Sequence, residues 1–204
     1  MTQAAPKLLT CEEFLNWYPN DGRRYELHRG VIVEMPPPTG PHEGVVGFLA
    51  LEIAVEAKKL ERNLRIPKTA FVKTPNNDSS YSPDILLLNY NNIAEEPFAN
   101  ISTVSNAVSV PLVVEVVSTN WRDDYYDKFG NYEEMGILEY WIVDYAAYGG
   151  RKFIGAEKYP TFFVCELIND EYEITAFRGN DLIISPTFPQ LKLTAQEVFN
   201  AASC

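Results

Sequence analysis

Residues 112–117 read Leu-Val-Val-Glu-Val-Val, an apolar run broken by one acidic side chain, Glu115. A strand of this composition is typical of a sheet that is covered on both faces. A helix is predicted over residues 122–135 and a second buried strand over 138–144, so strand, helix and strand follow one another. This succession predicts an α/β core.

Several patterns predict further elements on the N-terminal side of this core. A capping box made by Thr10 and Glu13 predicts a short helix over residues 11–18. The helical period of the apolar residues predicts the longest helix over 42–63. We expect a hairpin and two more strands, followed by a long connection with one helical turn; these lie at 24–28 with 31–35, at 70–73, at 83–88 and at 90–110.

After Arg151 the pattern becomes that of an antiparallel β-meander. Its strands are expected over 161–168, 172–178 and 181–184, and a last helix is expected from Thr194, whose capping partner is Glu197. Hydrophobic types make up 46% of the 204 residues, which is enough for a sizeable core. We therefore expect residues 1–204 to form a single domain.

Composition excludes several classes of protein. The longest apolar runs are far shorter than the roughly 20 residues needed to cross a bilayer, and residues 1–7 lack the pattern of a secretion signal. These features predict a cytoplasmic protein with no membrane partner. Cys11, Cys165 and Cys204 are scattered and odd in number, which favours partly buried thiols over disulfides or a zinc site.

The formal net charge of -11 counts against a general nucleic-acid binder, because an acidic surface repels a polyanion. It does not exclude a nuclease, since metal ions bound to a carboxylate site would offset part of that charge. Any contact with DNA is then expected to be local, metal-dependent or supplied by a partner.

Two carboxylates are candidates for chemistry. Glu115 lies inside an apolar strand, where an ionised group is costly unless it is paired or bound to metal. Asp84 follows Pro83 at the start of another apolar strand. Either residue alone has an ordinary explanation: an inward ion pair or an exposed strand edge for Glu115, and a turn for Asp84. Together, on neighbouring strands, they offer the hard oxygen ligands that Mg²⁺ requires.

Asp124, Lys128 and Tyr132 are spaced by four residues, which places them on one face of the predicted helix. One interpretation is a surface Asp–Lys pair beside a half-buried tyrosine. The other directs Lys128 toward the carboxylates, where its ammonium could orient a water molecule or stabilise charge on a phosphate. The spacing is compatible with both.

The order of these motifs resembles the Uma-two family of bacterial proteins over nearly the whole chain. The matching motifs are Tyr25-Glu26-Leu27, His42 at the start of a long helix, Ser82-Pro83-Asp84, Val114-Glu115-Val116-Val117-Ser118, then Asp124, Lys128, Tyr132 and Glu139-Tyr140-Trp141-Ile142-Val143-Asp144, with Ser185-Pro186-Thr187-Phe188-Pro189 and Leu191-Lys192-Leu193-Thr194 near the end.

The resemblance implies a restriction-endonuclease-like core: a mixed central sheet flanked by helices, with a C-terminal antiparallel β-meander. It also implies that Asp84, Glu115 and Glu26 hold Mg²⁺ or Mn²⁺ for cleavage of phosphodiester bonds in DNA. The motif of that superfamily places a lysine two residues after the second acidic residue, where this chain has Val117. Lys128 on the following helix would then be the replacement.

Other functions and roles stay open. The acidic balance is compatible with a non-catalytic binding or regulatory module, such as a homodimer, or with a hydrolase of smaller phosphoesters, which predicts a narrow pocket. For His42, a helix-capping or structural role is favoured over a place at the edge of the site. Tyr140 and Trp141 point to opposite sides of a strand, so one of them is expected in the core, and no role is assigned to His28.

Overall fold

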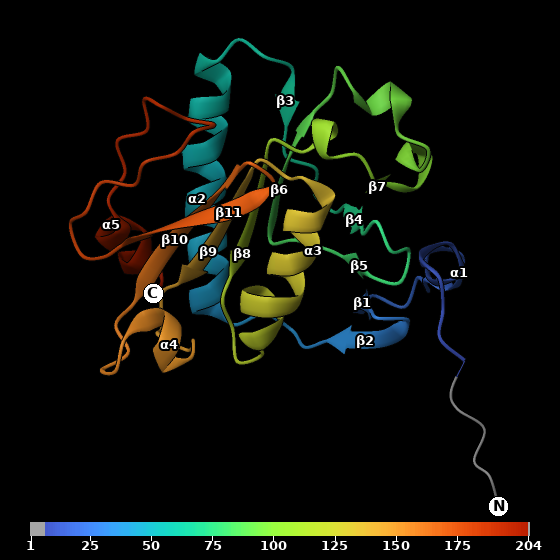
Figure 1. Cartoon of the computed structure of the whole chain (residues 1–204), viewed down its shortest axis with the longest axis horizontal. Coiled ribbons are helices and arrows are strands. Elements are labelled where there is room, and N and C mark those ends of the chain that lie inside the picture. Colours follow the sequence, from blue (N-terminus) through green and yellow to red (C-terminus); the bar gives the residue numbers. More distant parts are fainter. Residues whose placement is uncertain (1–6, 204) are drawn as a thin grey trace, which may run out of the picture.

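The structure is a computed structural model that describes residues 7–203, and its strands form two sheets (Figure 1). The smaller sheet has the order β2-β1-β5-β4-β7. Its strands are β1 (Arg24–His28), β2 (Val31–Met35), β4 (Phe71–Lys73), β5 (Ser80–Tyr81) and β7 (Thr103–Val104). The predicted hairpin is confirmed, because β1 and β2 pair antiparallel with Leu27 opposite Ile32.

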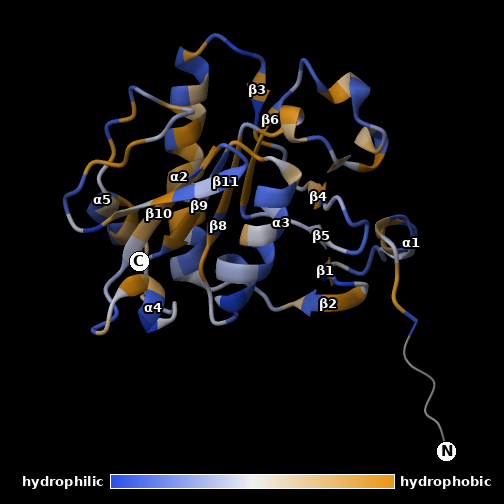
Figure 2. Cartoon of the chain, viewed as in Figure 1, coloured by the Kyte–Doolittle hydropathy of each residue, from blue (hydrophilic) through white to orange (hydrophobic). Residues whose placement is uncertain are grey.

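The larger sheet is mixed and has the order β11-β10-β9-β8-β6-β3. Only β8 and β9 run parallel; the other neighbours are antiparallel. Figure 2 shows its central strands in hydrophobic colours. The strands are β3 (Leu64–Arg65), β6 (Ile85–Asn89), β8 (Leu112–Val116), β9 (Glu139–Asp144), β10 (Thr161–Ile168) and β11 (Glu171–Phe177).

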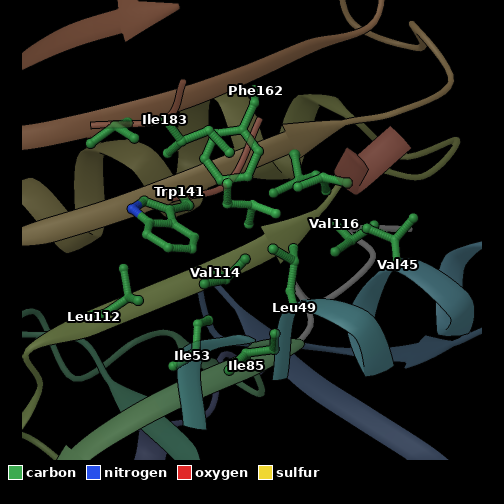
Figure 3. Close-up of a cluster of buried hydrophobic side chains, with 14 of the residues drawn as sticks. Val45, Leu49, Ile53, Ile85, Leu112, Val114, Val116, Trp141, Phe162 and Ile183 are labelled. Atoms are coloured by element: carbon green, nitrogen blue, oxygen red, sulfur yellow. The ribbon is translucent and has the colours of Figure 1, made fainter. Parts of the chain in front are cut away.

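Helices cover both faces of the larger sheet, with α2 on one face and α3 on the other (Figure 1). Val45, Leu49 and Ile53 of α2 pack on one face (Figure 3), and Tyr132 of α3 belongs to the cluster on the other. The helices are α1 (Cys11–Trp17), α2 (Gly40–Lys59), α3 (Lys128–Met135), α4 (Arg151–Ile154) and α5 (Ala195–Asn200), with single 3₁₀ turns at Ile93–Glu95, Ala99–Ile101 and Ala107–Ser109.

Both predicted capping boxes are present, at Thr10 with Glu13 and at Thr194 with Glu197. The expected third meander strand over 181–184 is wrong: its segment makes one isolated bridge, between Leu182 and Thr194. The helix expected from residue 122 is not uniform, because a π-helical segment (Asp123–Asp127) precedes α3.

One of Tyr140 and Trp141 was expected in the core, but helices cover both faces of the sheet, so both are. Both side chains are fully buried, each in a different core cluster. Cys11 and Cys165 are free thiols that are fully buried, where partly buried thiols were expected, and Cys204 lies outside the described residues. Of the helices in residues 7–203, none combines the length and the apolar character needed to cross a membrane.

Candidate active site

The pairing of β6 with β8 brings Asp84 next to Glu115. Ile85 is the partner of Val114, and each of these residues adjoins one of the two acidic residues. Glu115 is only 2% exposed and lies on β8, between β6 and β9, so it is not at a sheet edge. The two carboxylates therefore occupy corresponding places on neighbouring strands, as the sequence predicts.

Lys128 lies among the carboxylates. Its Nζ is 3.0 Å from Glu115 Oε2, 3.4 Å from Asp124 Oδ1 and 3.7 Å from Glu26 Oε1. Lys128 is 3% exposed and Asp124 is 4% exposed, so the interpretation as a surface ion pair is wrong. Position 117, where the superfamily motif places a lysine, is a buried valine, and the ammonium that faces Glu115 comes from the next helix.

Local backbone geometry places this lysine. The amide of Lys128 donates to the Asp123 carbonyl across the π-helical segment, and α3 begins at the same residue. π-helical turns are rare and recur at functional sites, because the inserted residue redirects the side chains that follow it. Here the segment supplies Asp124 and α3 supplies Lys128, both directed inward.

Glu26 joins the cluster from β1 of the smaller sheet. Its Oε1 accepts from the Ser82 amide at 2.9 Å and faces Lys128, while its Oε2 lies 2.9 Å from His28 Nε2. The side chain of Glu26 is 1% exposed. His28, to which the sequence assigned no role, therefore fixes one oxygen of this carboxylate.

Tyr132 contacts the same group from the next turn of α3. Its hydroxyl donates to Glu115 Oε1 at 3.0 Å, and its side chain is fully buried rather than half-buried. Since Lys128 faces Glu115 Oε2, both oxygens of Glu115 have a donor. The orientation of this carboxylate is therefore set from both sides.

His42 holds Asp84 in place. Asp84 Oδ2 accepts from the Val116 amide at 2.8 Å and lies 3.3 Å from His42 Nε2, which is also 3.0 Å from the Val116 carbonyl. Both neighbours of Nε2 are acceptors, so we assign its proton there. The helix cap is Thr39, whose hydroxyl accepts from the His42 amide; the capping role expected for the His42 side chain is wrong.

The cluster carries more negative than positive charge. Burial raises the pKa of Glu115 well above its usual value and that of Asp124 to about 7, although the Lys128 ammonium opposes both shifts. Burial also disfavours the charged form of Glu26, but Lys128 and the hydrogen bond from His28 hold its pKa below the usual value. The carboxylates in turn raise the pKa of Lys128 against the effect of burial, so it stays charged.

These groups line a cavity of about 240 Å³. The acidic groups and Lys128 form its charged part, and a wall of prolines and two tyrosines forms another part. The lining includes Arg24, Glu26, Pro36, Pro37, Pro38, His42, Asp84, Glu115, Asp124, Lys128, Tyr145 and Tyr148.

The donor chemistry fits a hard divalent cation. Every anionic group in the cavity is a carboxylate, and the excess of negative charge would be offset by a bound cation. Among the described residues, no group of three or more acidic, histidine or cysteine side chains is arranged so that it could hold a metal ion, and Lys128 lies between Glu26 and Glu115. The case for a divalent cation in this cavity therefore depends on the carboxylate oxygens and on the negative charge of the lining.

Two features of the site were missed by sequence reasoning. The pairing of His28 with Glu26 had a weak signal, because residues two apart on a strand share a face. Asp144, at the end of β9, was noted only as part of a motif, yet it is fully buried and accepts from the Gly149 amide at 2.8 Å. No local pattern distinguishes it from an ordinary aspartate at a strand end.

Comparisons with known proteins bear on the family and the fold of the chain. The model of the Uma2 family, described as "Putative restriction endonuclease", matches residues 11–196. A solved structure from Anabaena variabilis, described as a putative nuclease belonging to DUF820, superposes with a TM-score of 0.73 and 20% sequence identity. It covers 95% of this chain and 99% of its own. No curated protein matches the chain. The second comparison confirms the expected fold.

Proposed function

The chain belongs to the Uma2 family, the Uma-two family that its motifs resemble, and we propose that it is a divalent-metal-dependent endonuclease acting on phosphodiester bonds in DNA. The observation that carries the proposal is the buried Lys128 ammonium among Glu26, Glu115 and Asp124, beside Asp84 in one cavity. Structural ion pairs do not need a cavity, whereas a hydrolytic site does.

In this proposal Asp84, Glu115 and Glu26, which all line the cavity, would hold Mg²⁺ or Mn²⁺. The ion would polarise the phosphate and favour ionisation of a water molecule. Lys128 would orient the attacking water or stabilise negative charge on the phosphate oxygens. Tyr132 and His42 keep Glu115 and Asp84 in fixed orientations, which preserves the geometry of the site.

The test is cleavage of plasmid, single-stranded DNA, RNA and nucleotide substrates by the metal-free protein, before and after addition of Mg²⁺ or Mn²⁺. We expect no cleavage with a chelator present and cleavage on restoration of the metal. Calorimetry on the same preparation measures metal binding directly. Cleavage that persists with the chelator would contradict metal dependence, and neither cleavage nor metal binding would favour a non-catalytic binding module.

Hydrolysis of smaller phosphoesters is a second candidate, favoured by the size of the cavity. A volume of about 240 Å³ is below the range of roughly 300–1,000 Å³ that is usual for ligand pockets. The net charge of -11 also disfavours long polyanions. In the same assay this candidate predicts turnover of nucleotides with no cleavage of plasmid or oligonucleotide.

Replacing His42 with asparagine is expected to lower metal affinity and cleavage by about tenfold to a hundredfold, the usual effect of removing a group that orients a ligand. The shorter amide loses the contacts that His42 Nε2 makes with Asp84 and the Val116 carbonyl. Calorimetry with Mn²⁺ and initial cleavage rates measure the two effects. Equal metal affinity in variant and native protein would show that His42 does not position Asp84.

A further inference from the structure

Asp144 is a fully buried carboxylate that the proposed hydrolysis does not use. Its Oδ1 accepts from the Tyr148 amide at 2.8 Å, and its Oδ2 accepts from the Gly149 amide at 2.8 Å and the Tyr125 hydroxyl at 3.1 Å. The two amide bonds tie the loop that follows β9 to the end of that strand, and the Tyr125 hydroxyl ties the same carboxylate to the π-helical segment. A buried carboxylate is costly unless its oxygens are satisfied, so this loop has a defined shape.

The loop is also closely packed. A Cβ atom at Gly149 would lie 2.8 Å from Asp144 Oδ2 and 2.9 Å from the Tyr125 hydroxyl, so a side chain there would displace one of these two groups. Ala147 has a φ of 55°, and the Tyr148 carbonyl accepts from Lys158 Nζ at 3.1 Å. A backbone fixed at so many points holds the side chains it carries in place.

This loop carries Tyr145 and Tyr148, which both line the cavity. Their rings are perpendicular, with centroids 6.4 Å apart, and Tyr148 is 36% exposed. Exposed aromatic rings held by a rigid backbone are how proteins stack the bases of unpaired nucleic acid, because every base has a π-face. A paired base inside a duplex cannot offer that face.

The charges around the cavity also disfavour a duplex. Of its lining residues only Arg24 and Lys128 are lysine or arginine, and Lys128 is buried against carboxylates. Arg24 is exposed and is thus the one available for a phosphate. Duplex binding relies on many phosphate contacts by cations, whereas a flexible strand can send one nucleotide into a deep site.

We propose that the cavity accepts a nucleotide of an unpaired DNA strand, whose base stacks on the exposed ring of Tyr148 and meets the perpendicular ring of Tyr145 with its edge, while its phosphate reaches the Asp84, Glu115 and Lys128 cluster. This inference rests on the proposed nuclease function and names the form of its substrate. Asp144 acts as a positioning residue that holds the aromatic loop against the cavity.

The test measures binding of a fluorescent single-stranded oligonucleotide, of the duplex of the same sequence, and of a strand with abasic sites, by anisotropy with Mg²⁺ or with a chelator. We expect the single strand to bind more tightly than the duplex or the abasic strand. Tyr148→Ala should weaken single-strand binding about fivefold to a hundredfold, the range of one base–aromatic stack. Tyr148→Phe keeps the ring and should restore binding relative to alanine.

Tyr159→Ala is the matched control, because Tyr159 is 51% exposed and does not line the cavity. Equal binding of single strand and duplex, or equal binding of the native and abasic strands, would overturn the inference without any variant. If the protein cleaves duplex DNA and Tyr148→Ala leaves that rate unchanged, the inference fails and the nuclease function stands. If Tyr148-dependent binding occurs with no metal-dependent cleavage, the nuclease function fails and the inference stands.

Discussion

Replacing Lys128 with methionine is expected to lower the free energy of unfolding by about 3–5 kcal/mol, the usual effect of removing one partner of a buried ion pair. Methionine fills a similar volume but leaves Glu26, Glu115 and Asp124 without the ammonium that lies within 3.7 Å of each. A loss of this size is a large part of the roughly 5–15 kcal/mol that stabilises a typical domain. Denaturant unfolding followed by circular dichroism measures it.

The loss of unfolding free energy in Lys128→Met should depend on pH, because the carboxylates left without the ammonium titrate. Without Lys128 the folded-state pKa values of Glu115 and Asp124 rise further, and the pKa of Asp124 is already about 7. A carboxyl group whose folded pKa is raised gives a stability that is retained below its unfolded pKa and lost as pH rises through the folded value. The gap between native protein and variant should therefore be wider at pH 8 than at pH 5.

Lys58→Met is the matched control for this experiment. Lys58 is exposed on α2, and its replacement should change the free energy of unfolding by no more than about 0.5 kcal/mol. A Lys128→Met variant as stable as this control at pH 8 would show that the carboxylates do not depend on the lysine.

The central elements could be predicted because their patterns are strong and local. The apolar run around Glu115 defines β8, and the helical period around Leu49 and Ile53 defines α2, whose faces pack as expected. The two-residue strands β3, β5 and β7 had no comparable signal, since pairing with distant segments alone defines them.

The wrong third meander strand has a physical reason. Ile183 is buried, but Leu182 and Ile184 are 59% and 71% exposed, which gives the alternation of a strand. Pro186 follows shortly after the segment. The segment's backbone bonds to Leu193 and Ala195 on either side of Thr194, which makes one isolated bridge at Leu182 rather than a ladder. Alternating burial shows which side chains face inward, but a strand also needs a neighbouring strand for its backbone hydrogen bonds.

The site itself was partly predictable. Sequence order suggested Glu26, Asp84, Glu115 and Lys128, but their convergence depends on the β6–β8 register and on the π-helical segment, neither of which has a sequence signature. The burial of Asp124 follows from the same segment. Asp144 and His42 bond to backbone groups, namely the Tyr148 amide and the Val116 carbonyl. A pattern of side-chain types along the sequence gives no sign of such contacts.

Replacing Asp84 with asparagine is expected to reduce metal-dependent cleavage by at least about a thousandfold. A metal ion contributes several kcal/mol of transition-state stabilisation, and about 1.4 kcal/mol corresponds to a tenfold change in rate. Asparagine keeps the shape of the side chain and an oxygen for the Val116 amide, which now donates to Asp84 Oδ2 at 2.8 Å. The variant should therefore fold normally while its metal affinity, measured by calorimetry, falls with its rate.

Asp170→Asn makes the same chemical change at a control position. Asp170 is exposed in the turn between β10 and β11, where its φ of 67° suits asparagine equally well. This control should cleave DNA at the native rate, so that any loss in Asp84→Asn reflects its position in the site. Unchanged cleavage by Asp84→Asn would exclude Asp84 as a metal ligand and would leave the buried cluster around Lys128 as an ion-pair network that orients β8 and α3.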